Sequence, residues 1–417
     1  MGQTEAAVPG VDSYLLLCCG GLEHVVADAL RERLHDPGIS VEPIPRQELT
    51  NNHSGGAAGV GKLLVSVPHA SDSADVRAAL RGDTEPCIII GLALIQHQTG
   101  TVKPEKEAGL QELGAAVAQS QRWAAALNLL ARHLRDQGEA AAAQRIAEGT
   151  LRFRSSCVRD GPHDWSSNEA MASVGEAVGE RFRWGVSMSA FDCDVCTIVL
   201  RDCMACGLTL KLLHHKSGNR LPHEPRAYLQ RGGRIAMLRP STAHALLRAA
   251  RVAPGATLLD PMGGIGTIAV EAALAVAGAR CISSDTSVEA TACARENAAA
   301  CAGACVGSVE VHQWDAAALQ LPDASVTHVV TDMPFGRQYG SARANKQQVP
   351  RLLSEWRRVL KVGGRAVLLS TYSHVIVAAA AAVDVAQGGE GARWRVEQDL
   401  PVNIGGVPAS VVVLERL

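Results

Sequence analysis

Aromatic residues are scarce in this chain: tryptophan, tyrosine and phenylalanine together make up 3% of its 417 residues. Long hydrophobic runs are also missing, because no apolar stretch approaches the ~20 residues that a membrane-spanning helix needs. The first residues show no basic stretch followed by an apolar core, so we expect no secretory signal. These absences argue against a membrane protein and indicate a protein of the cytoplasm, which could also have a nuclear pool.

Excess charge of one sign is lacking as well. The formal net charge is −2, so any surface that binds nucleic acid must be a local patch. Cysteine is not scarce, since the chain has 12, but without a secretory signal these are expected to remain reduced thiols. The length and the 47% hydrophobic content are typical of a globular protein with two to four domains.

The N-terminal part alternates short strand and helix patterns. An apolar run at residues 14–19 precedes apolar residues at helical spacing over 22–30, and residues 62–67 and 87–94 have the composition of strands. We predict that residues 1–95 form an α+β, ferredoxin-like part. Residues 96–150 are rich in Ala, Gln, Glu and Arg, which predicts a helical or disordered insert.

A second α+β unit is predicted at residues 151–212. Residues 151–158 suit a strand, and residues 168–182 suit a helix that Ser166 and Glu169 would cap reciprocally. Residues 195–200 and 205–210 suit two strands around a turn at Arg201 and Asp202.

A basic segment follows. Between residues 211 and 251, nine Lys and Arg residues against the single acid Glu224 give a local charge of 9 − 1 = +8. The basic residues are Lys211, Lys216, Arg220, Arg226, Arg231, Arg234, Arg239, Arg248 and Arg251. A solvated linker over residues 213–240 and a track for RNA phosphates both explain this composition.

The last domain, residues 241–417, alternates strands and helices. Strands are predicted at residues 257–260, 280–285, 309–315, 326–332 and 364–370, with a helix at 287–300 between two of them. This alternation predicts an α/β fold with a doubly wound, mostly parallel sheet.

Ligands of such sheets bind at the carboxyl ends of the strands. Four of the predicted ends carry an acid, namely Asp260, Asp285, Asp315 and Asp332. Gly264 and Gly266 follow the first strand and let the backbone approach a ligand at a helix N-terminus. Asp285 lies 19 residues after Gly266, where an acid can bind ribose hydroxyls, and Asp315 is placed to reach an adenine amine. The glycine loop alone fits a dinucleotide-dependent enzyme equally well.

The turn after the fourth strand favours a different chemistry. The Asp332 carboxylate and the Pro334 carbonyl can accept both hydrogens of an exocyclic base amine, and Phe335 can stack on an extruded base. Hydride transfer requires no such arrangement, so the turn favours methyl transfer to a base amine. The alternative is an ordinary turn with Phe335 in the core.

Two potential metal sites are discounted. Cys193, Cys196, Cys203 and Cys206 have zinc-like spacing, but a hairpin turning at residues 201–202 would pair Cys196 with Gly207 and point Cys193 and Cys196 to opposite faces. Buried thiols explain them better. His214, His215 and His223 fall in the basic segment, where solvent or phosphate contacts are expected. No metal ligand is therefore predicted.

At Asp260-Pro261-Met262 and Asp332-Met333-Pro334-Phe335 the chain resembles the THUMP-domain RNA guanine-N2 methyltransferases, especially their eukaryotic tRNA-modifying members. The similarity continues through Ser167-Asn168-Glu169, Trp314-Asp315 and Val402-Asn403-Ile404-Gly405-Gly406. It implies a THUMP RNA-binding region at residues 151–212, followed by a seven-stranded class I methyltransferase domain. It also implies S-adenosylmethionine as cofactor, guanosine-6 of the tRNA acceptor stem as target, and a small activator subunit as partner.

The resemblance also implies roles for individual residues. The cofactor would be held by Asp260, Pro261, Gly264, Gly266, Asp285 and Asp315, and the target base by Asp332, Pro334 and Phe335. RNA would be bound by Arg154, Ser167, Asn168, Arg226 and Arg239, and the charge of the basic segment adds Arg231 and Arg234 to these candidates. Gly263 and Ile265 depart from the family, which often has Cys and Thr or Ser there. The other functions considered are methylation of another RNA or of an adenine amine, and an RNA-binding homologue without activity.

Overall fold

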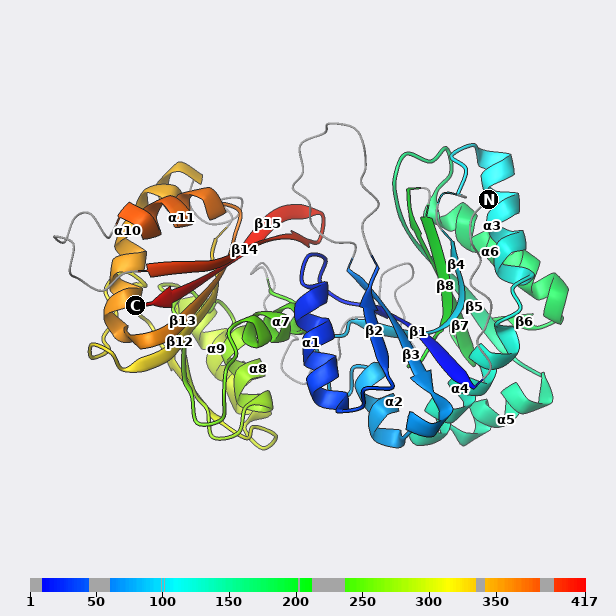
Figure 1. The fold of residues 1–417 in the computed structure, drawn as a ribbon, viewed down its shortest axis with the longest axis horizontal. Helices are drawn as coiled ribbons and strands as arrows, with labels where there is room; N and C mark the ends of the chain where they lie inside the picture. The colour runs from blue at the N-terminus through cyan, green and yellow to red at the C-terminus, as the bar shows by residue number, and fades with distance from the viewer. Residues whose placement is uncertain are drawn as a thin grey trace. The chain divides into compact units, whose positions relative to one another are not determined.

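The chain divides into two compact units, one built on an eight-stranded sheet and the other on a seven-stranded sheet (Figure 1). The computed structural model describes residues 10–44, 61–98, 100, 102–201, 203–211, 237–334, 342–382 and 394–417. None of the helices in these ranges is both long and apolar enough to cross a membrane.

The N-terminal unit has one continuous sheet. Its strands are β1 (Val11–Leu17), β2 (Ser40–Pro43), β3 (Lys62–Pro68), β4 (Ile90–Gln98), β5 (Arg152–Asp160), β6 (Gly185–Val186), β7 (Cys193–Leu200) and β8 (Cys203–Thr209). Their order across the sheet is β2-β3-β1-β4-β8-β7-β5-β6. Neighbours are antiparallel, except that β5 runs parallel to β6 and β7. A parallel pair needs a crossover helix, which α6 (Ser167–Phe182) provides between β5 and β7.

The remaining helices of this unit are α1 (Glu23–Leu34), α2 (Ala74–Leu80), α3 (Lys106–Ala118), α4 (Trp123–Asp136) and α5 (Ala140–Glu148), with a 3₁₀ turn at His69–Ser71.

Helix α6 begins with the N-terminal cap that the sequence predicted. Ser166 Oγ accepts a hydrogen bond from the Glu169 amide, and the Glu169 carboxylate accepts one from the Ser166 amide. The predicted pairing of Cys196 with Gly207 is also confirmed.

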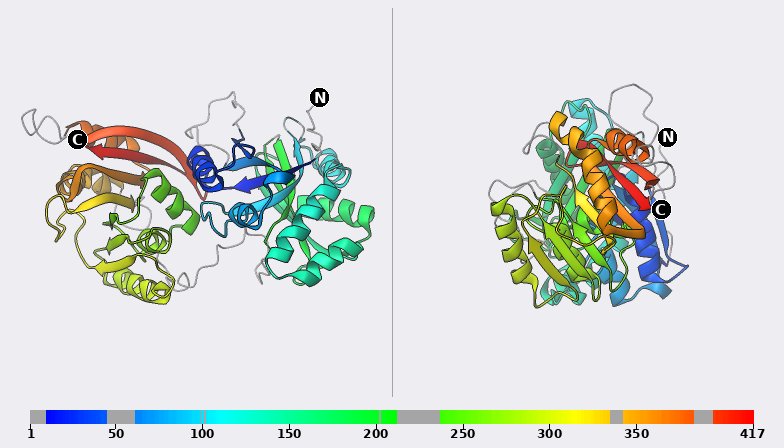
Figure 2. Two further views of the ribbon diagram at one scale, coloured as in Figure 1. Left: turned by 60° about the horizontal axis from the view of Figure 1, so that its bottom comes forward. Right: turned by 90° about the vertical axis from the view of Figure 1, so that its left-hand side faces the viewer.

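The structure differs from the expectation of two separate α+β units. Strand β4, from residues 1–95, pairs directly with β8, from residues 151–212, so the two ranges share one sheet. The segment between them is helical, as predicted, but it is not a separate insert, because its helices α3 and α4 pack against this sheet (Figure 2). The composition of a segment indicates that it forms a strand, but it does not indicate which distant strand it pairs with. The pairing of β4 with β8 therefore could not be predicted from the sequence pattern.

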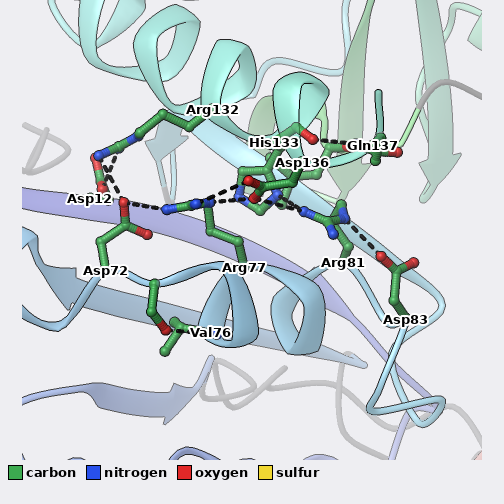
Figure 3. Close-up of polar contacts among 12 residues, drawn as sticks. Asp12, Asp72, Val76, Arg77, Arg81, Asp83, Arg132, His133, Asp136 and Gln137 are labelled. Carbon is green, nitrogen blue, oxygen red and sulfur yellow. Dashed lines mark hydrogen bonds and ion pairs between the residues drawn. The ribbon is translucent and has the colours of Figure 1, made fainter. Parts of the chain in front are cut away.

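An ion-pair network attaches α4 to the N-terminal strand and to α2 (Figure 3). Arg132 binds Asp12 of β1 at 2.5 Å and Asp72, just before α2, at 3.1 Å. Arg77 joins Asp72 at 2.7 Å to Asp136 at 2.6 Å. Both Asp12 and Asp72 have side chains less than a tenth exposed, so these cations compensate charges that water scarcely reaches.

The C-terminal unit has the predicted doubly wound sheet. Its strands are β9 (Thr257–Asp260), β10 (Arg280–Ser284), β11 (Ser308–His312), β12 (Val326–Asp332), β13 (Leu360–Ser370), β14 (Trp394–Ile404) and β15 (Val407–Arg416). Their order is β11-β10-β9-β12-β13-β15-β14, and only the hairpin of β14 and β15, drawn in red in Figure 2, brings an antiparallel strand. The helices are α7 (Pro240–Ala249), α8 (Thr267–Ala275), α9 (Val288–Cys301), α10 (Ala342–Val359) and α11 (Ser373–Ala382).

The strand order reverses between β9 and β12, which lie side by side at the centre of this sheet. From β9 the chain proceeds outward through β10 and β11, then returns to β12 and proceeds the other way through β13. Helices α7, α8 and α9 lie along one face and α10 and α11 along the other (Figure 1). Ligands of open α/β sheets bind at such a reversal, outside the carboxyl ends of the strands.

Replacing Arg132 by methionine tests whether the helical segment is part of the N-terminal unit. The buried carboxylates of Asp12 and Asp72 would lose a cation, which we expect to cost about 2 kcal/mol and to lower the thermal midpoint by roughly 4–8 °C. Circular dichroism measures the midpoint, and hydrogen exchange should show reduced protection in β1 as well as α4. Arg135→Met, at an exposed position of the same helix, is the matched control. Equal midpoints for the two variants would contradict the attachment.

Candidate active site

The two central strands each end on an aspartate. Asp260 is the last residue of β9, and Asp332 is the last residue of β12. The apolar residues of both strands are buried, because helices cover both faces of the sheet, while Thr327, His328 and Asp332 of β12 are half-buried. The acids therefore sit at the rim of a hydrophobic core and not on an open surface.

Asp260 is buried, and two described groups donate hydrogen bonds to one of its oxygens. Its Oδ1 accepts a hydrogen bond from Thr331 Oγ1 at 2.7 Å and from the Met262 amide at 3.3 Å. Burial raises the pKa of Asp260 to about 7, and repulsion from Asp332 and Asp285 acts in the same direction. The hydroxyl of Thr331 fixes the orientation of this carboxyl group.

Asp332 has an unused oxygen. Its Oδ1 is fully buried and has no hydrogen-bond partner among the described residues. Burial raises the pKa of Asp332 to about 7. The next residue, Met333, donates its amide to the Leu369 carbonyl and so holds the turn against β13. A buried polar atom without a partner is costly, and a bound donor would remove that cost.

The glycine loop leaves its backbone open. Gly264 and Gly266 have φ values of 53° and 85°, which favour glycine, and a Cβ at Gly264 would meet no atom within 4 Å. Gly266 is the N-cap of α8 and receives no side-chain cap. Pro261 is buried at the start of the loop, and its carbonyl accepts a hydrogen bond from Ser284. The open turn at a helix N-terminus suits a polar or anionic ligand group.

Asp285 ties the glycine loop to the next strand. Its carboxylate accepts hydrogen bonds from the Gly264 amide at 3.0 Å and from the Ser287 amide at 2.8 Å. The side chain is half-buried just after β10, so its free lone pairs remain available to ribose hydroxyls. The same acid thus shapes the loop and faces the predicted ligand position.

Asp315 is more exposed than the other three acids. It follows β11, accepts the Ala317 amide at 2.9 Å, and lies 3.7 Å from the guanidinium of Arg351. The neighbouring Trp314 stacks on His312 with ring centroids 4.0 Å apart. Contact with an adenine at this position stays a prediction.

Sequence reasoning missed two hydroxyl residues at these strand ends. Thr331 is fully buried and bonded to Asp260, and Thr371, just after β13, has a buried Oγ1 without a partner among the described residues. The only signal for Thr331 was a polar residue between two apolar valines and the acid at the strand end. Phe335 lies outside the described residues, whereas Pro334 is described and half-buried.

The residues predicted to contact RNA differ in their exposure and in the partners they already have. Arg154 has a side chain only 15% exposed; it pairs with Asp194 at 2.5 Å and lies 4.2 Å above the Phe191 ring, so its guanidinium is engaged within the fold. Ser167 is half-buried and Asn168 exposed in the first turn of α6, and Arg239 is exposed directly before α7. Arg226, Arg231 and Arg234 lie outside the described residues, as do His214, His215 and His223.

The cysteines at zinc-like spacing are strand residues in the sheet. Cys193, Cys196 and Cys206 are buried and Cys203 is half-buried. Burial raises the pKa of the Cys206 thiol to about 12, and Thr197 donates a hydrogen bond to its sulfur. Within the described ranges, no three His, Cys, Asp or Glu side chains are grouped so that they could hold a metal ion.

The arrangement suits a ligand rich in hydrogen-bond donors. Asp260, Asp285 and Asp332 gather acceptors around an open glycine turn at the central strand reversal. Adenosine hydroxyls, an ammonium group and a cationic centre would all be stabilised there. A second donor, such as a base amine, could reach the unused oxygen of Asp332.

Comparison with known proteins agrees with this chemistry. Residues 229–390 match a family model described as an RMKL-like methyltransferase domain. The chain is 31% identical over 295 residues to the tRNA (guanine(6)-N(2))-methyltransferase THUMP3 of Bos taurus, covering 68% of this chain and 54% of that protein. It is also 34% identical over 155 residues to the U6 snRNA (guanine-N(2))-methyltransferase THUMPD2 of Bos taurus, covering 37% of this chain and 29% of that protein. The chain therefore spans about half the length, or less, of these curated relatives.

A solved structure resembles the whole chain. The crystal structure of TrmN from Thermus thermophilus aligns with a TM-score of 0.62 at 22% identity, over 97% of this chain and 99% of that one. The likeness shows a shared fold, and the predicted class I methyltransferase architecture is confirmed.

The pH dependence of thermal stability tests the raised pKa of Asp260. Because the folded state raises the pKa of Asp260 to about 7, protonated Asp260 is stabilising at low pH, and that stability is lost as pH rises from about 4 through 7. Asp260→Asn stays neutral, so its thermal midpoint relative to the wild type should rise by at least about 3 °C between pH 4.5 and pH 7.5. Asp399→Asn, at an exposed position of β14, should show no such trend. A constant difference for Asp260→Asn would refute the raised pKa.

Proposed function

This chain belongs to the family of THUMP-domain guanine-N2 methyltransferases, and we propose that it transfers a methyl group from S-adenosylmethionine to the N2 amine of guanosine-6 in tRNA. The proposal depends on the buried Oδ1 of Asp332 at the end of β12, which has no hydrogen-bond partner in the described part of the chain. This oxygen lies at the strand reversal, beside the open glycine turn, where an amine and a cofactor can meet.

The residues around the glycine turn fit S-adenosylmethionine. Asp285 would bind the ribose hydroxyls and Asp315 the adenine amine, while the turn at Gly264 and Gly266 leaves room for the backbone to approach the cofactor. Asp260 would balance positive charge next to the turn. When bound, the cofactor supplies an electrophilic methyl group on a sulfonium that leaves without protonation.

Asp332 and the turn after it would act on the guanine. The N2 amine is a poor nucleophile because its lone pair is delocalised into the ring, and hydrogen bonds to the Asp332 carboxylate and the Pro334 carbonyl would favour a tetrahedral nitrogen. Phe335 would stack on the base. As the nitrogen–carbon bond forms and the carbon–sulfur bond breaks, the amine nitrogen must lose a proton. A carboxyl whose pKa is about 7 suits transfer of that proton to solvent.

We assign RNA binding to the N-terminal unit together with the basic segment before α7. Ser167, Asn168 and Arg239 are the described candidates that are accessible, at least in part, to a bound RNA. Arg154 would contribute by shaping the surface through its pair with Asp194, since its charge is already compensated. A small activator subunit on the methyltransferase domain and a cytoplasmic location, with a nuclear pool, complete the proposal.

A second RNA substrate class has its own support. The similarity to a U6 snRNA guanine-N2 methyltransferase makes small nuclear RNA the main alternative to tRNA. Incubation with fractionated total RNA, followed by mass spectrometry of nucleosides, separates the two. N2-methylguanosine confined to tRNA, at position 6, supports the proposal. The same product confined to small nuclear RNA favours the alternative, and absence of product in both refutes guanine-N2 methylation.

Removing the carboxylate of Asp332 should stop the reaction. For Asp332→Ala we expect turnover to fall at least about 1,000-fold while the Kd for S-adenosylmethionine changes less than about tenfold, because the acid acts mainly on the amine. Single-turnover kinetics and calorimetry measure the two quantities. Asp399→Ala, exposed on β14, serves as control and should leave both unchanged. Near-normal turnover of Asp332→Ala would disprove the assigned role.

The basic segment should govern the salt dependence of RNA binding. Neutralising Arg226, Arg231 and Arg234 together should weaken tRNA binding and reduce the slope of log K against log salt by about 2–3 units, because phosphate contacts release counterions. Filter binding at several salt concentrations measures this slope. Neutralising Arg33, Arg135 and Lys361, which are exposed elsewhere, matches the charge change. If both triple variants keep the wild-type slope, the segment is a linker and not a phosphate track.

A further inference from the structure

Two acids at the centre of the C-terminal unit, the buried Asp260 and the half-buried Asp332, receive few hydrogen bonds from the described residues, and we call Asp260 and Asp332 the acid pair. They end neighbouring parallel strands, and repulsion between them contributes to the electrostatics of Asp260. Asp260 is 2% exposed, and the Thr331 hydroxyl and the Met262 amide both donate hydrogen bonds to its Oδ1. Oδ1 of Asp332 is buried without a partner in the described part of the chain.

Among the described residues, the charged groups that act on Asp260 are Asp332 and, just after β10, Asp285, and both are acids that raise its pKa. For Asp332, burial is the cause of the raised pKa. No Lys or Arg of the described segments makes a hydrogen bond or ion pair with either acid.

We propose that the acid pair selects the charged cofactor over its demethylated product: it ionises when a sulfonium cation enters the site and regains a proton when a neutral thioether takes its place. This inference rests on the proposed function and concerns the same site. An uncompensated buried carboxylate is unfavourable, so the empty site retains a proton. A nearby cation reverses that balance, and the proton is released to solvent.

S-adenosylmethionine and S-adenosylhomocysteine share their ammonium, carboxylate and adenosine groups. They differ in one methyl group and in the positive charge on sulfur. Any difference in proton release between the two ligands therefore reports the sulfonium alone. Because binding and protonation are linked, the preference for the charged ligand must increase with pH over the range in which the pair titrates.

Both carboxyl groups have a pKa of about 7, which places this range at physiological pH. After methyl transfer the charge on sulfur is gone, so reprotonation of the pair removes part of the attraction for the product. The pair would thereby favour product release as well as cofactor binding.

Thr331 is assigned as the positioning residue of the acid pair. Its hydroxyl donates to Asp260 Oδ1 at 2.7 Å, and its backbone leads directly into Asp332. The donated hydrogen bond stabilises the ionised form of Asp260 and holds its orientation. Serine keeps that hydroxyl, whereas valine keeps the shape of threonine without it.

Calorimetry of the full chain with each ligand tests the proposal. Titrations at pH 6, 7 and 8, in phosphate and in Tris, give the Kd and the number of protons released. We expect S-adenosylmethionine to release more protons at pH 7 than S-adenosylhomocysteine, by about 0.3–1 proton. The ratio of the Kd for the product to the Kd for the cofactor should rise about three- to tenfold from pH 6 to pH 8, since one pKa unit corresponds to tenfold.

Variants localise the effect. Asp260→Asn should remove most of the pH dependence of the Kd ratio, Thr331→Val should shift its midpoint to higher pH, and Thr331→Ser should restore the wild-type profile.

Equal proton release for both ligands, or a Kd ratio independent of pH, would overturn the proposal while leaving methyl transfer intact. Should the chain bind neither ligand, the proposed function itself fails. If Asp260→Asn does not fold, the valine and serine variants decide alone, and identical profiles for them contradict the assignment.

Discussion

The free-energy cost of placing carboxyl groups at the end of an apolar sheet is the constraint on which the rest of this structure depends. Water cannot solvate Asp260 fully, and one oxygen of Asp332 has no partner among the described residues. A fold retains such groups only when another requirement offsets their cost. The proposed ligands, which carry positive charge and amine hydrogens, would offset that cost here. The same poorly solvated carboxyl groups that make the empty site unfavourable would also bind a cationic ligand.

The surrounding elements keep that arrangement in place. Buried strands fix the positions of Asp260 and Asp332, the glycine loop is held by the carboxylate of Asp285, and the Met333 amide anchors the turn to β13. None of these contacts requires a long flexible side chain, so the acceptors are preorganised before a ligand arrives. In the N-terminal unit, charges are used differently. Arg77 and Arg132 compensate buried acids and attach α4 to the sheet, which gives stability.

Much of the C-terminal unit could be predicted from local patterns. Strands β9 and β12 have the predicted bounds, because a short apolar run that ends on an acid marks the carboxyl end of a buried strand. The cap of α6 followed from Ser166 and Glu169 alone. Non-local relations escaped prediction: the pairing of β4 with β8, the engagement of Arg154 by Asp194, and the bond from Thr331 to Asp260. Each depends on residues at least 40 positions apart, and no sequence period encodes such partners.

The protonation state of the acid pair in the ligand-free protein can be measured directly. Carbon-13 NMR of aspartate-labelled protein, titrated from pH 4 to pH 9, reports each carboxyl group separately. We expect two carboxyl resonances that titrate near pH 7, one of which is lost in Asp260→Asn. If every aspartate resonance instead titrates below about pH 5, as unperturbed carboxyl groups do, the strand ends hold ordinary solvated acids and the central claim is contradicted.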